Sequence, residues 1–293
     1  GGGGEVKAEG TVAEVLAGEA RFAVVHGNSW RVRRSLPNGS IDVDLSDPPY
    51  SSGGLMRGDR AKSTDRKYTQ SGSEGRRPDF TGDAMDQRVW TRWCAQWMEE
   101  ARRCASAQGK LAAFIDWRQL PAMTDAVQLA GWIWRGVAAW DKGEGSRVTP
   151  GGFRAQCEYI VWATVGPLPM PEPGVLVLPG CFRSPVRQDD KFHQTGKSTP
   201  LMRELVKLCP PDGLIFDGFA GSGTTAVAAI LEGRRVIAVE RSEEYHRVAL
   251  ERCRAAAEGR RPDVRFGDGV LDTSSPVRVE AGDSGPLFAG GAR

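Results

Sequence analysis

The segment from residue 214 to residue 240 constrains the fold of this chain more than any other. An apolar run leads into a glycine-rich turn at residues 217–223, and a stretch with helical spacing follows at residues 226–232. Gly233 stops that stretch, and a second apolar run ends on Glu240. This order predicts a β–α–β unit of a nucleotide-binding sheet, in which glycines let the backbone approach a ligand and the terminal acid can accept both hydroxyls of a ribose.

The glycine turn alone does not decide the ligand. A P-loop is excluded, because the turn lacks the lysine that would hold the phosphates. A dinucleotide site stays open, since Gly221-x-Gly223-x-x-Ala226 fits a loose form of the GxGxxG/A pattern. A nicotinamide-dependent oxidoreductase is therefore one interpretation of this turn.

A second informative feature is Asp47-Pro48-Pro49-Tyr50, which follows the alternating apolar run at residues 41–45. The alternation predicts a strand that delivers the tetrapeptide to the carboxyl edge of a sheet. Asp47 offers a carboxylate acceptor, the prolines give a stiff backbone that presents its carbonyls, and Tyr50 offers a flat ring for stacking. This combination suits the exocyclic amine of a flipped-out nucleobase, although the tetrapeptide taken alone also fits a loop with a turn.

Together the two features resemble one family, the amino-methyltransferases that use S-adenosylmethionine to methylate N6 of adenine or N4 of cytosine in DNA. The order, with Asp-Pro-Pro-Tyr early and Phe-x-Gly-x-Gly late, is similar to the permuted β-class arrangement. Residues 193–197 resemble the family's His-x-Thr-x-Lys segment, and residues 26–28 and 36–42 resemble its lead-in to the catalytic strand. The resemblance covers about residues 20–257 and implies an α/β fold, with a Rossmann-like, mostly parallel twisted sheet and helices on both faces.

The chemistry of an amine acceptor fits the tetrapeptide. The lone pair of the amine is delocalised into the base, and methyl transfer requires it to be localised in line with the S–CH₃ bond. Asp47 would accept one N–H and the carbonyl of Pro48 the other, while Tyr50 would stack on the extruded base. The catalytic candidates are Asp47, Pro48, Pro49 and Tyr50, and no covalent enzyme intermediate is required.

The resemblance also implies a set of contacts to S-adenosylmethionine. The backbone of the glycine turn would wrap the methionine moiety, Thr195 and Lys197 would hold its carboxylate, Glu240 the ribose, and Asn28 the adenine edge. Asn28 also fits a simple turn former, and Glu240 a solvated acid at a strand end. The cofactor candidates are Asn28, Asp47, Thr195, Lys197, Asp217, Phe219, Ala220, Gly221, Ser222, Gly223, Thr224 and Glu240.

The chain departs from the family pattern at three positions. Relatives usually have Pro where this chain has Gly218 and Ser198, and Asp is common where it has Asn28. Glycine adds backbone freedom, and asparagine replaces a charged acceptor by a neutral amide. Neither change removes a reacting group, so we expect weaker cofactor binding rather than inactivity.

Composition limits the class of protein. The 293 residues, 40% of them hydrophobic, suffice for one α/β core with a small appendage. The six cysteines show no metal-ligand spacing, so we predict no metal site and reduced thiols in a cytoplasmic compartment. The absence of a Pro-Cys pair argues against cytosine C5 methylation. No apolar run reaches membrane-spanning length, and no secretion signal opens the sequence.

The net charge is only +2, so any DNA affinity must come from local clusters. Between residues 57 and 77, seven Lys and Arg side chains stand against three acids, which predicts a phosphate-binding flap within a basic loop at residues 51–88. A solvated loop without this role is the alternative. The DNA-binding candidates are Arg57, Arg60, Lys62, Arg66, Lys67, Arg76 and Arg77, together with Arg183 and Arg187 from a short target-recognition segment at residues 165–191.

The predicted organisation has three parts. Residues 1–20 are expected to be loosely ordered, residues 21–258 form the methyltransferase domain, and residues 259–293 form a flexible tail. Within the domain, apolar residues recur at helical spacing between residues 89 and 104, which predicts a helix with a buried face. Further strands are predicted at residues 21–26, 111–116, 133–140 and 157–164, and further helices at residues 123–130 and 198–209.

Several functions remain open at this point. N6 of adenine is the favoured target because Asp opens the tetrapeptide, with N4 of cytosine and adenine in RNA as alternatives. A non-catalytic DNA-binding protein with a methyltransferase fold is a third class. DNA is the expected partner, while a cognate restriction endonuclease and a homodimer stay open. Lys142 resembles a family segment near the target base, but a surface lysine is the simpler interpretation.

Overall fold

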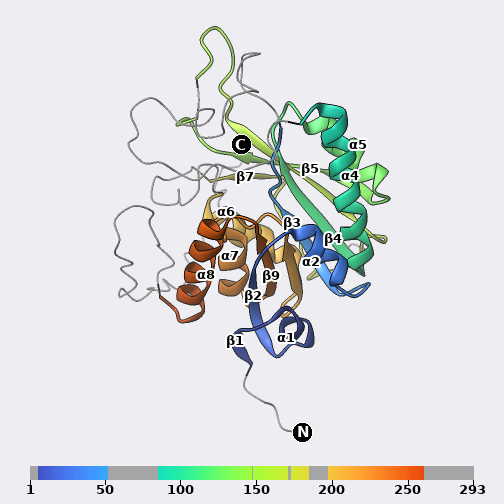
Figure 1. Ribbon diagram of the computed structural model, residues 1–293. Helices are drawn as coiled ribbons and strands as arrows, with labels where there is room; N and C mark the ends of the chain where they lie inside the picture. Colours follow the sequence, from blue (N-terminus) through green and yellow to red (C-terminus); the bar gives the residue numbers. More distant parts are fainter. Residues whose placement is uncertain (1–5, 52–84, 147, 171–172, 185–196, 261–293) are drawn as a thin grey trace.

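The computed structural model describes residues 6–51, 85–146, 148–170, 173–184 and 197–260. Within them the strands form one nine-stranded sheet in the order β1-β2-β9-β8-β3-β4-β6-β5-β7 (Figure 1). All pairings are parallel except those that β6 makes with β4 and β5. The strands are β1 (Lys7–Glu9), β2 (Ala20–His26), β3 (Ile41–Ser46), β4 (Ala105–Ile115), β5 (Ile133–Asp141), β6 (Cys157–Thr164), β7 (Cys181–Arg183), β8 (Leu214–Asp217) and β9 (Arg235–Glu240).

Helices cover both faces of this sheet, as Figure 1 shows. On one face α6, α7 and α8 pack against Val43 of β3 and against Ala112 and Phe114 of β4. On the other face α4 and α5 pack against Leu111 and Ala113, the residues of β4 that alternate with them. The helices are α1 (Val12–Ala17), α2 (Ser29–Ser35), α4 (Gln87–Cys104), α5 (Leu120–Leu129), α6 (Thr199–Leu205) with a 3₁₀ turn (Val206–Leu208), α7 (Thr224–Leu231) and α8 (Glu243–Ala257). The predicted fold class, a mostly parallel sheet between two layers of helices, is confirmed.

The helix predicted from apolar periodicity is α4. Its buried residues are Trp90, Cys94, Trp97, Met98, Ala101 and Cys104, which recur every three or four positions. All of them except Cys104 form one core with α5 and the sheet, and Cys104 packs in the neighbouring core under α1 and α2. The prediction of a buried helix face is therefore confirmed.

The predicted loose order of residues 1–20 is wrong for the part that the structure describes. Strand β1 pairs in parallel with β2, with Lys7 opposite Ala20, and α1 follows it. The Thr11 side chain accepts from the backbone N–H of Glu14, whose carboxylate accepts from the backbone N–H of Thr11. This capping box fixes the start of α1, and its Thr-x-x-Glu signature was present in the sequence.

Other boundaries differ by smaller amounts. Strand β4 begins at Ala105, directly after α4, whereas a start at residue 111 was predicted. Helix α2 was not predicted; it begins after Asn28, whose side chain accepts from the backbone N–H of Trp30 at 2.9 Å. Within the predicted target-recognition segment, β7 pairs in parallel with β5 at the edge of the sheet. No helix among the described residues has the length and apolar character needed to cross a membrane.

Candidate active site

A cavity of about 860 Å³ lies at the carboxyl ends of β3, β8 and β9. Strand β3 pairs with β8, and β8 with β9, so the residues that follow these strands meet at one edge of the sheet. The lining includes Asn28, Asp47, Pro48, Pro49, Tyr50, Trp93, Trp97, Lys197, Asp217, Phe219, Ala220, Gly221, Ser222, Thr224 and Glu240. The two sequence motifs thus share one cavity.

The tetrapeptide is held by contacts from both sides. The indole Nε1 of Trp90 donates to the carbonyl oxygen of Pro49 at 2.8 Å. At Ser51, the hydroxyl accepts from the backbone N–H of Met85 at 3.3 Å, and the carbonyl accepts from Nε2 of Gln119 at 3.2 Å. These contacts anchor the tetrapeptide to α4 and to the turn after β4.

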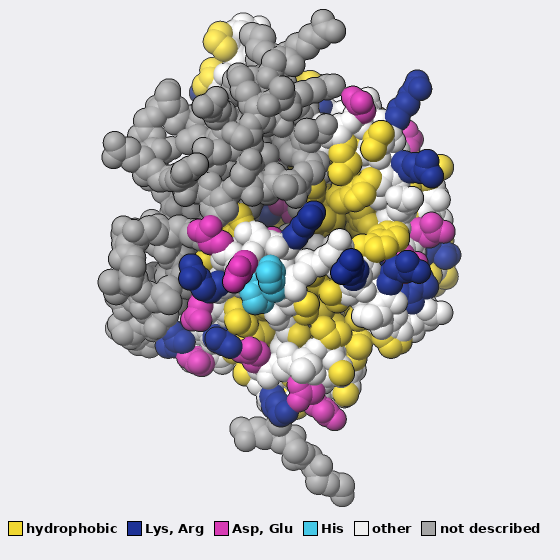
Figure 2. Space-filling view, in the orientation of Figure 1, with side chains coloured by type: hydrophobic (Ala, Val, Ile, Leu, Met, Phe, Trp, Pro, Cys, Tyr) yellow, Lys and Arg dark blue, Asp and Glu magenta, His cyan; other side chains and the backbone are white. Residues whose placement is uncertain are grey.

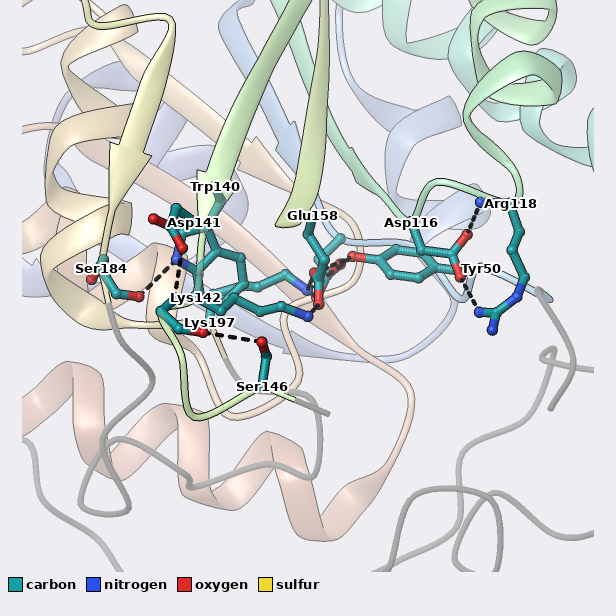
Figure 3. A network of polar contacts seen from close by, with 12 residues as sticks. Tyr50, Asp116, Arg118, Trp140, Asp141, Lys142, Ser146, Glu158, Ser184 and Lys197 are labelled. Atoms are coloured by element: carbon teal, nitrogen blue, oxygen red, sulfur yellow. Dashed lines mark hydrogen bonds and ion pairs between the residues drawn. The ribbon is translucent and has the colours of Figure 1, made fainter. Parts of the chain in front are cut away.

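An ionic network surrounds the tetrapeptide carboxylate. Lys197 Nζ lies 3.0 Å from Asp47 Oδ2 and 2.9 Å from Glu158 Oε2, and it donates to Tyr50 Oη at 2.9 Å. Tyr50 Oη donates to Asp47 Oδ1 at 2.7 Å. Lys142 Nζ completes the set at 3.1 Å from Glu158 Oε1 (Figure 3). We call Asp47, Tyr50, Lys142, Glu158 and Lys197 the carboxylate–lysine network.

The structure changes the interpretation of both lysines. Lys197, 6% exposed, was expected at a ligand carboxylate, but its Nζ reaches three acceptors inside the network. Lys142 is not a free surface lysine, because its side chain is 23% exposed and pairs with Glu158. Glu158 itself was missed, and the available signal was a single acid in the otherwise apolar run at residues 157–164.

Burial and neighbouring charges compete within the network. Burial raises the pKa of Asp47, and the charge of Lys197 acts against this rise. Burial also acts to raise the pKa of Glu158, but Lys197 and Lys142 outweigh it and lower the value to about 2. For Lys197, Asp47 and Glu158 outweigh burial and raise the pKa, so the lysine stays charged.

The glycine turn is fixed by two carboxylates. Glu240 Oε2 accepts from the backbone N–H of Gly221 at 2.7 Å, and Oε1 accepts from that of Ser242 at 2.7 Å. Asp217 Oδ1 accepts from the backbone N–H of Phe219 at 2.9 Å. Burial raises the pKa of Glu240, and it raises the pKa of Asp217 to about 7. Both predicted acids therefore lie at the cavity, and each bonds the backbone of the turn or of the segment that follows β9.

Helix α8 supports the turn from behind. Arg252, 1% exposed, donates through Nη1 to the carbonyl of Ser222 at 2.6 Å and to the hydroxyl of Thr224 at 3.2 Å. Gly223 has a φ of +83°, and a Cβ built there would lie 2.9 Å from the Cβ of Ala249. The turn therefore requires glycine at this position for its conformation and for its approach to α8.

The remaining predicted residues fall into two groups. Arg183 is described; its side chain is 68% exposed and its Nε lies 3.7 Å from Asp141 Oδ2. Outside the described residues lie Arg57, Arg60, Lys62, Arg66, Lys67, Arg76, Arg77, Arg187 and Thr195. In the described part of the chain, no group of three or more His, Cys, Asp or Glu side chains is arranged to hold a metal ion.

The sequence is similar to known DNA methylases. A family model described as DNA methylase matches residues 178–251. The putative methylase YubD of Escherichia coli K12 is 28% identical over 233 residues, which cover 79% of this chain and 89% of YubD. The type II methyltransferase M.HinfI of Haemophilus influenzae is 26% identical over 261 residues, covering 79% of this chain and 68% of that protein.

Solved structures show the same fold. The M1.HpyAVI–SAM complex superposes with a TM-score of 0.55 at 18% identity, covering 78% of this chain and 97% of that one. The PvuII DNA methyltransferase, described as cytosine-N4-specific, superposes with a TM-score of 0.59 at 14% identity, covering 86% of this chain and 89% of that one.

Proposed function

The chain belongs to the S-adenosylmethionine-dependent DNA amino-methyltransferases, and from this premise we propose that it methylates the exocyclic amine of a flipped-out DNA base, with N6 of adenine preferred. One observation carries the proposal: a single cavity joins Asp47 and Tyr50 to the glycine turn and Glu240. A reaction between a base and a nucleoside-bearing cofactor requires both components in one enclosed space.

The cavity suits S-adenosylmethionine, which when bound supplies an electrophilic methyl group on a sulfonium. Its volume lies in the range of about 300–1,000 Å³ typical of ligand sites. The Glu240 carboxylate keeps lone pairs that can accept from ribose hydroxyls. The ring of Phe219 offers an apolar wall, and its centroid lies 5.8 Å from that of Trp93 and 5.6 Å from that of Trp97. Asn28 uses its oxygen to cap α2, which leaves its amide N–H groups for the adenine edge. Thr195 remains our candidate for the methionine carboxylate, and Lys197 is assigned to the catalytic side.

The tetrapeptide supplies the acceptors for the amine. Asp47 accepts one N–H and takes up the proton that the methylated nitrogen must lose. The carbonyl of Pro48 accepts the other N–H, because the carbonyl of Pro49 is already bonded to Trp90. The ring of Tyr50, with its hydroxyl fixed by the network, stacks on the base and offsets the few kcal/mol of unstacking.

We assign a DNA contact to the turn after β4. Trp117 is 57% exposed, and the guanidinium carbon of Arg118 lies 4.9 Å from the centroid of its ring. Asp116 Oδ1 accepts from the backbone N–H groups of Arg118 and Gln119 at 3.0 and 3.1 Å, which fixes the turn. On the face drawn in Figure 2, described Lys and Arg side chains are interspersed with acids, so local features such as this turn must supply the affinity.

The same proposal covers the methyltransferase class, the recognition sequence, the phosphate contacts, the partners and the second target base. The motif order supports the permuted class, and the short segment at residues 165–191 supports a short or relaxed recognition sequence. The seven cations between residues 57 and 77 remain our candidates for phosphate contacts, and a homodimer or a cognate restriction endonuclease remain candidate partners. N4 of cytosine is the second target, because the cytosine-N4-specific PvuII enzyme shares the fold.

Methyl transfer from labelled S-adenosylmethionine to mixed-sequence DNA, followed by nucleoside mass spectrometry, tests the proposal. We expect N6-methyladenine from the wild type and a rate at least about 10²-fold lower for Asp47→Asn, which retains shape but cannot take up the proton. N4-methylcytosine would correct only the base. If the protein binds S-adenosylmethionine but transfers no label to DNA, the proposal is contradicted. RNA would then be the favoured substrate, to be tested by competition between RNA and DNA, or the protein would have a binding role alone.

A further inference from the structure

Glu158 hydrogen-bonds two side chains that surround the Asp47 carboxylate, those of Tyr50 and Lys197. It lies on β6, opposite Trp140 of β5, and its side chain is 18% exposed. One oxygen, Oε2, accepts from Lys197 Nζ at 2.9 Å and from Tyr50 Oη at 3.2 Å. The other, Oε1, accepts from Lys142 Nζ at 3.1 Å. Each oxygen of this carboxylate therefore has a cationic partner.

The charges of the network balance only when Glu158 is ionised. Asp47 and Glu158 share Lys197, whose Nζ lies 3.0 and 2.9 Å from the two carboxylates, and Lys142, at the other oxygen of Glu158, supplies the second positive charge. Without the charge of Glu158, Lys197 would have Asp47 as its one carboxylate partner among the network residues. A carboxylate that is fully paired to an ammonium is a weaker acceptor for a further N–H and a weaker base.

Glu158 also fixes the stacking ring. The hydroxyl of Tyr50 carries one proton and faces two carboxylates, at 2.7 Å for Asp47 and 3.2 Å for Glu158, while it accepts from Lys197. Three partners, one after β3, one on β6 and one before α6, thus determine the position of the phenol oxygen. Loss of one partner allows the ring to rotate away from the plane on which a base would stack.

We propose that Glu158 is a positioning residue for methyl transfer: it draws Lys197 away from Asp47 and anchors Tyr50, so that Asp47 stays a strong acceptor for the amine. The inference rests on the proposed function, but its electrostatic part concerns Asp47 alone and can be measured without DNA. The titratable groups facing Glu158 are Asp47 and Tyr50 after β3, Lys197 before α6 and Lys142 after β5.

The direction of the effect follows from these neighbours. The negative charge of Glu158 acts to raise the pKa of Asp47, whereas Lys197 acts to lower it. Glu158→Gln keeps the shape and an acceptor oxygen but removes the charge. The pKa of Asp47 should therefore fall in this variant, because one raising neighbour is lost and Lys197 turns fully to Asp47.

The first measurement is the pKa of Asp47, obtained from a pH titration that is monitored by ¹³C NMR. The protein is labelled at the aspartate carboxyls, and Asp47→Asn identifies the Asp47 signal. We expect a lower Asp47 pKa in Glu158→Gln and an unchanged one in Glu99→Gln, which removes an exposed acid from α4. Glu158→Asp retains the charge and should retain the Asp47 pKa. An unchanged Asp47 pKa in a folded Glu158→Gln variant would overturn the proposal, whether or not the chain methylates DNA.

The second measurement is the kinetic profile. Glu158→Gln should lower kcat at least about tenfold, with the KM for S-adenosylmethionine unchanged, and should move the acid limb of kcat to lower pH. Glu158→Asp should keep the wild-type acid limb. A purely structural role would lower kcat without moving that limb, and this result would also overturn the proposal. If the wild type transfers no methyl group to DNA, the proposed function fails. The Asp47 pKa measured by NMR would still show whether Glu158 acts on Asp47.

Discussion

Gly218 lies directly against the guanidinium of Arg33. A Cβ built at Gly218 would come within 2.9 Å of Arg33 Nη2 and 3.2 Å of Phe216 Cε1. Arg33, 2% exposed, forms a buried ion pair with Asp44, and its guanidinium carbon lies 4.3 Å from the centroid of the Phe216 ring. The glycine at position 218 therefore makes room for a buried arginine beneath the glycine turn.

Gly218→Ala should destabilise the fold by about 1–3 kcal/mol, because the new Cβ must displace Arg33 or the turn. Urea denaturation measures the loss. Gly180→Ala is the matched control, since a Cβ built at Gly180 meets nothing within 4 Å and its stability should change by less than about 0.5 kcal/mol. Equal stabilities of the two variants would show that the space around Gly218 is not limiting.

Asp217 should make the stability of the cofactor-free protein fall with rising pH. Burial raises its pKa from 3.8 to about 7, so the protonated form stabilises the fold, and this contribution is lost between about pH 4 and pH 7. Asp217→Asn is neutral throughout. The free energy of unfolding of the variant minus that of the wild type should therefore grow by roughly 4 kcal/mol over this range and stay constant above it.

The check is urea denaturation of both proteins at each pH unit from 4 to 8. Asp125→Asn, at an exposed position of α5, serves as the control and should follow the wild type. A difference that shrinks with rising pH would contradict the prediction.

Arg252→Met should weaken S-adenosylmethionine binding about tenfold while it leaves the tetrapeptide untouched. The variant keeps an unbranched apolar stem but loses the bonds to Ser222 and Thr224 that hold the glycine turn. Isothermal titration calorimetry gives the Kd. Arg254→Met removes an arginine that is 43% exposed, pairs with Glu9 and lies on the same helix, and it should bind like the wild type. Equal affinities for the Arg252 variant and the wild type would refute a role in holding the turn.

Trp117→Ala should raise the Kd for DNA at least about fivefold, because stacking of one base on an aromatic ring is worth about 1–3 kcal/mol. Fluorescence anisotropy with a labelled duplex measures the change. Trp134→Ala is the control, since Trp134 is 42% exposed but is the second residue of β5, at the end of the strands opposite the cavity. Similar losses in both variants would point to a general effect of surface apolar area.

The sequence predicted the parts of the fold that short segments determine. The apolar runs at β3, β8 and β9 and the periodicity of α4 report burial directly, so their meeting at one sheet edge could be predicted. The pairing of Glu158 with Lys197 could not, because it joins residues 39 positions apart through the antiparallel insertion of β6 between β4 and β5. Strand order of this kind is set by packing between elements and leaves no local signal.

Ser51 and Met85, the described residues on either side of residues 52–84, are joined directly, because the Met85 backbone N–H donates to the Ser51 hydroxyl. Trp90, one turn into α4, bonds the carbonyl of Pro49, so both ends of the intervening 33 residues are fastened beside the reacting groups. The two points at which residues 52–84 join the described fold are therefore held by hydrogen bonds within that fold, next to Asp47 and Tyr50.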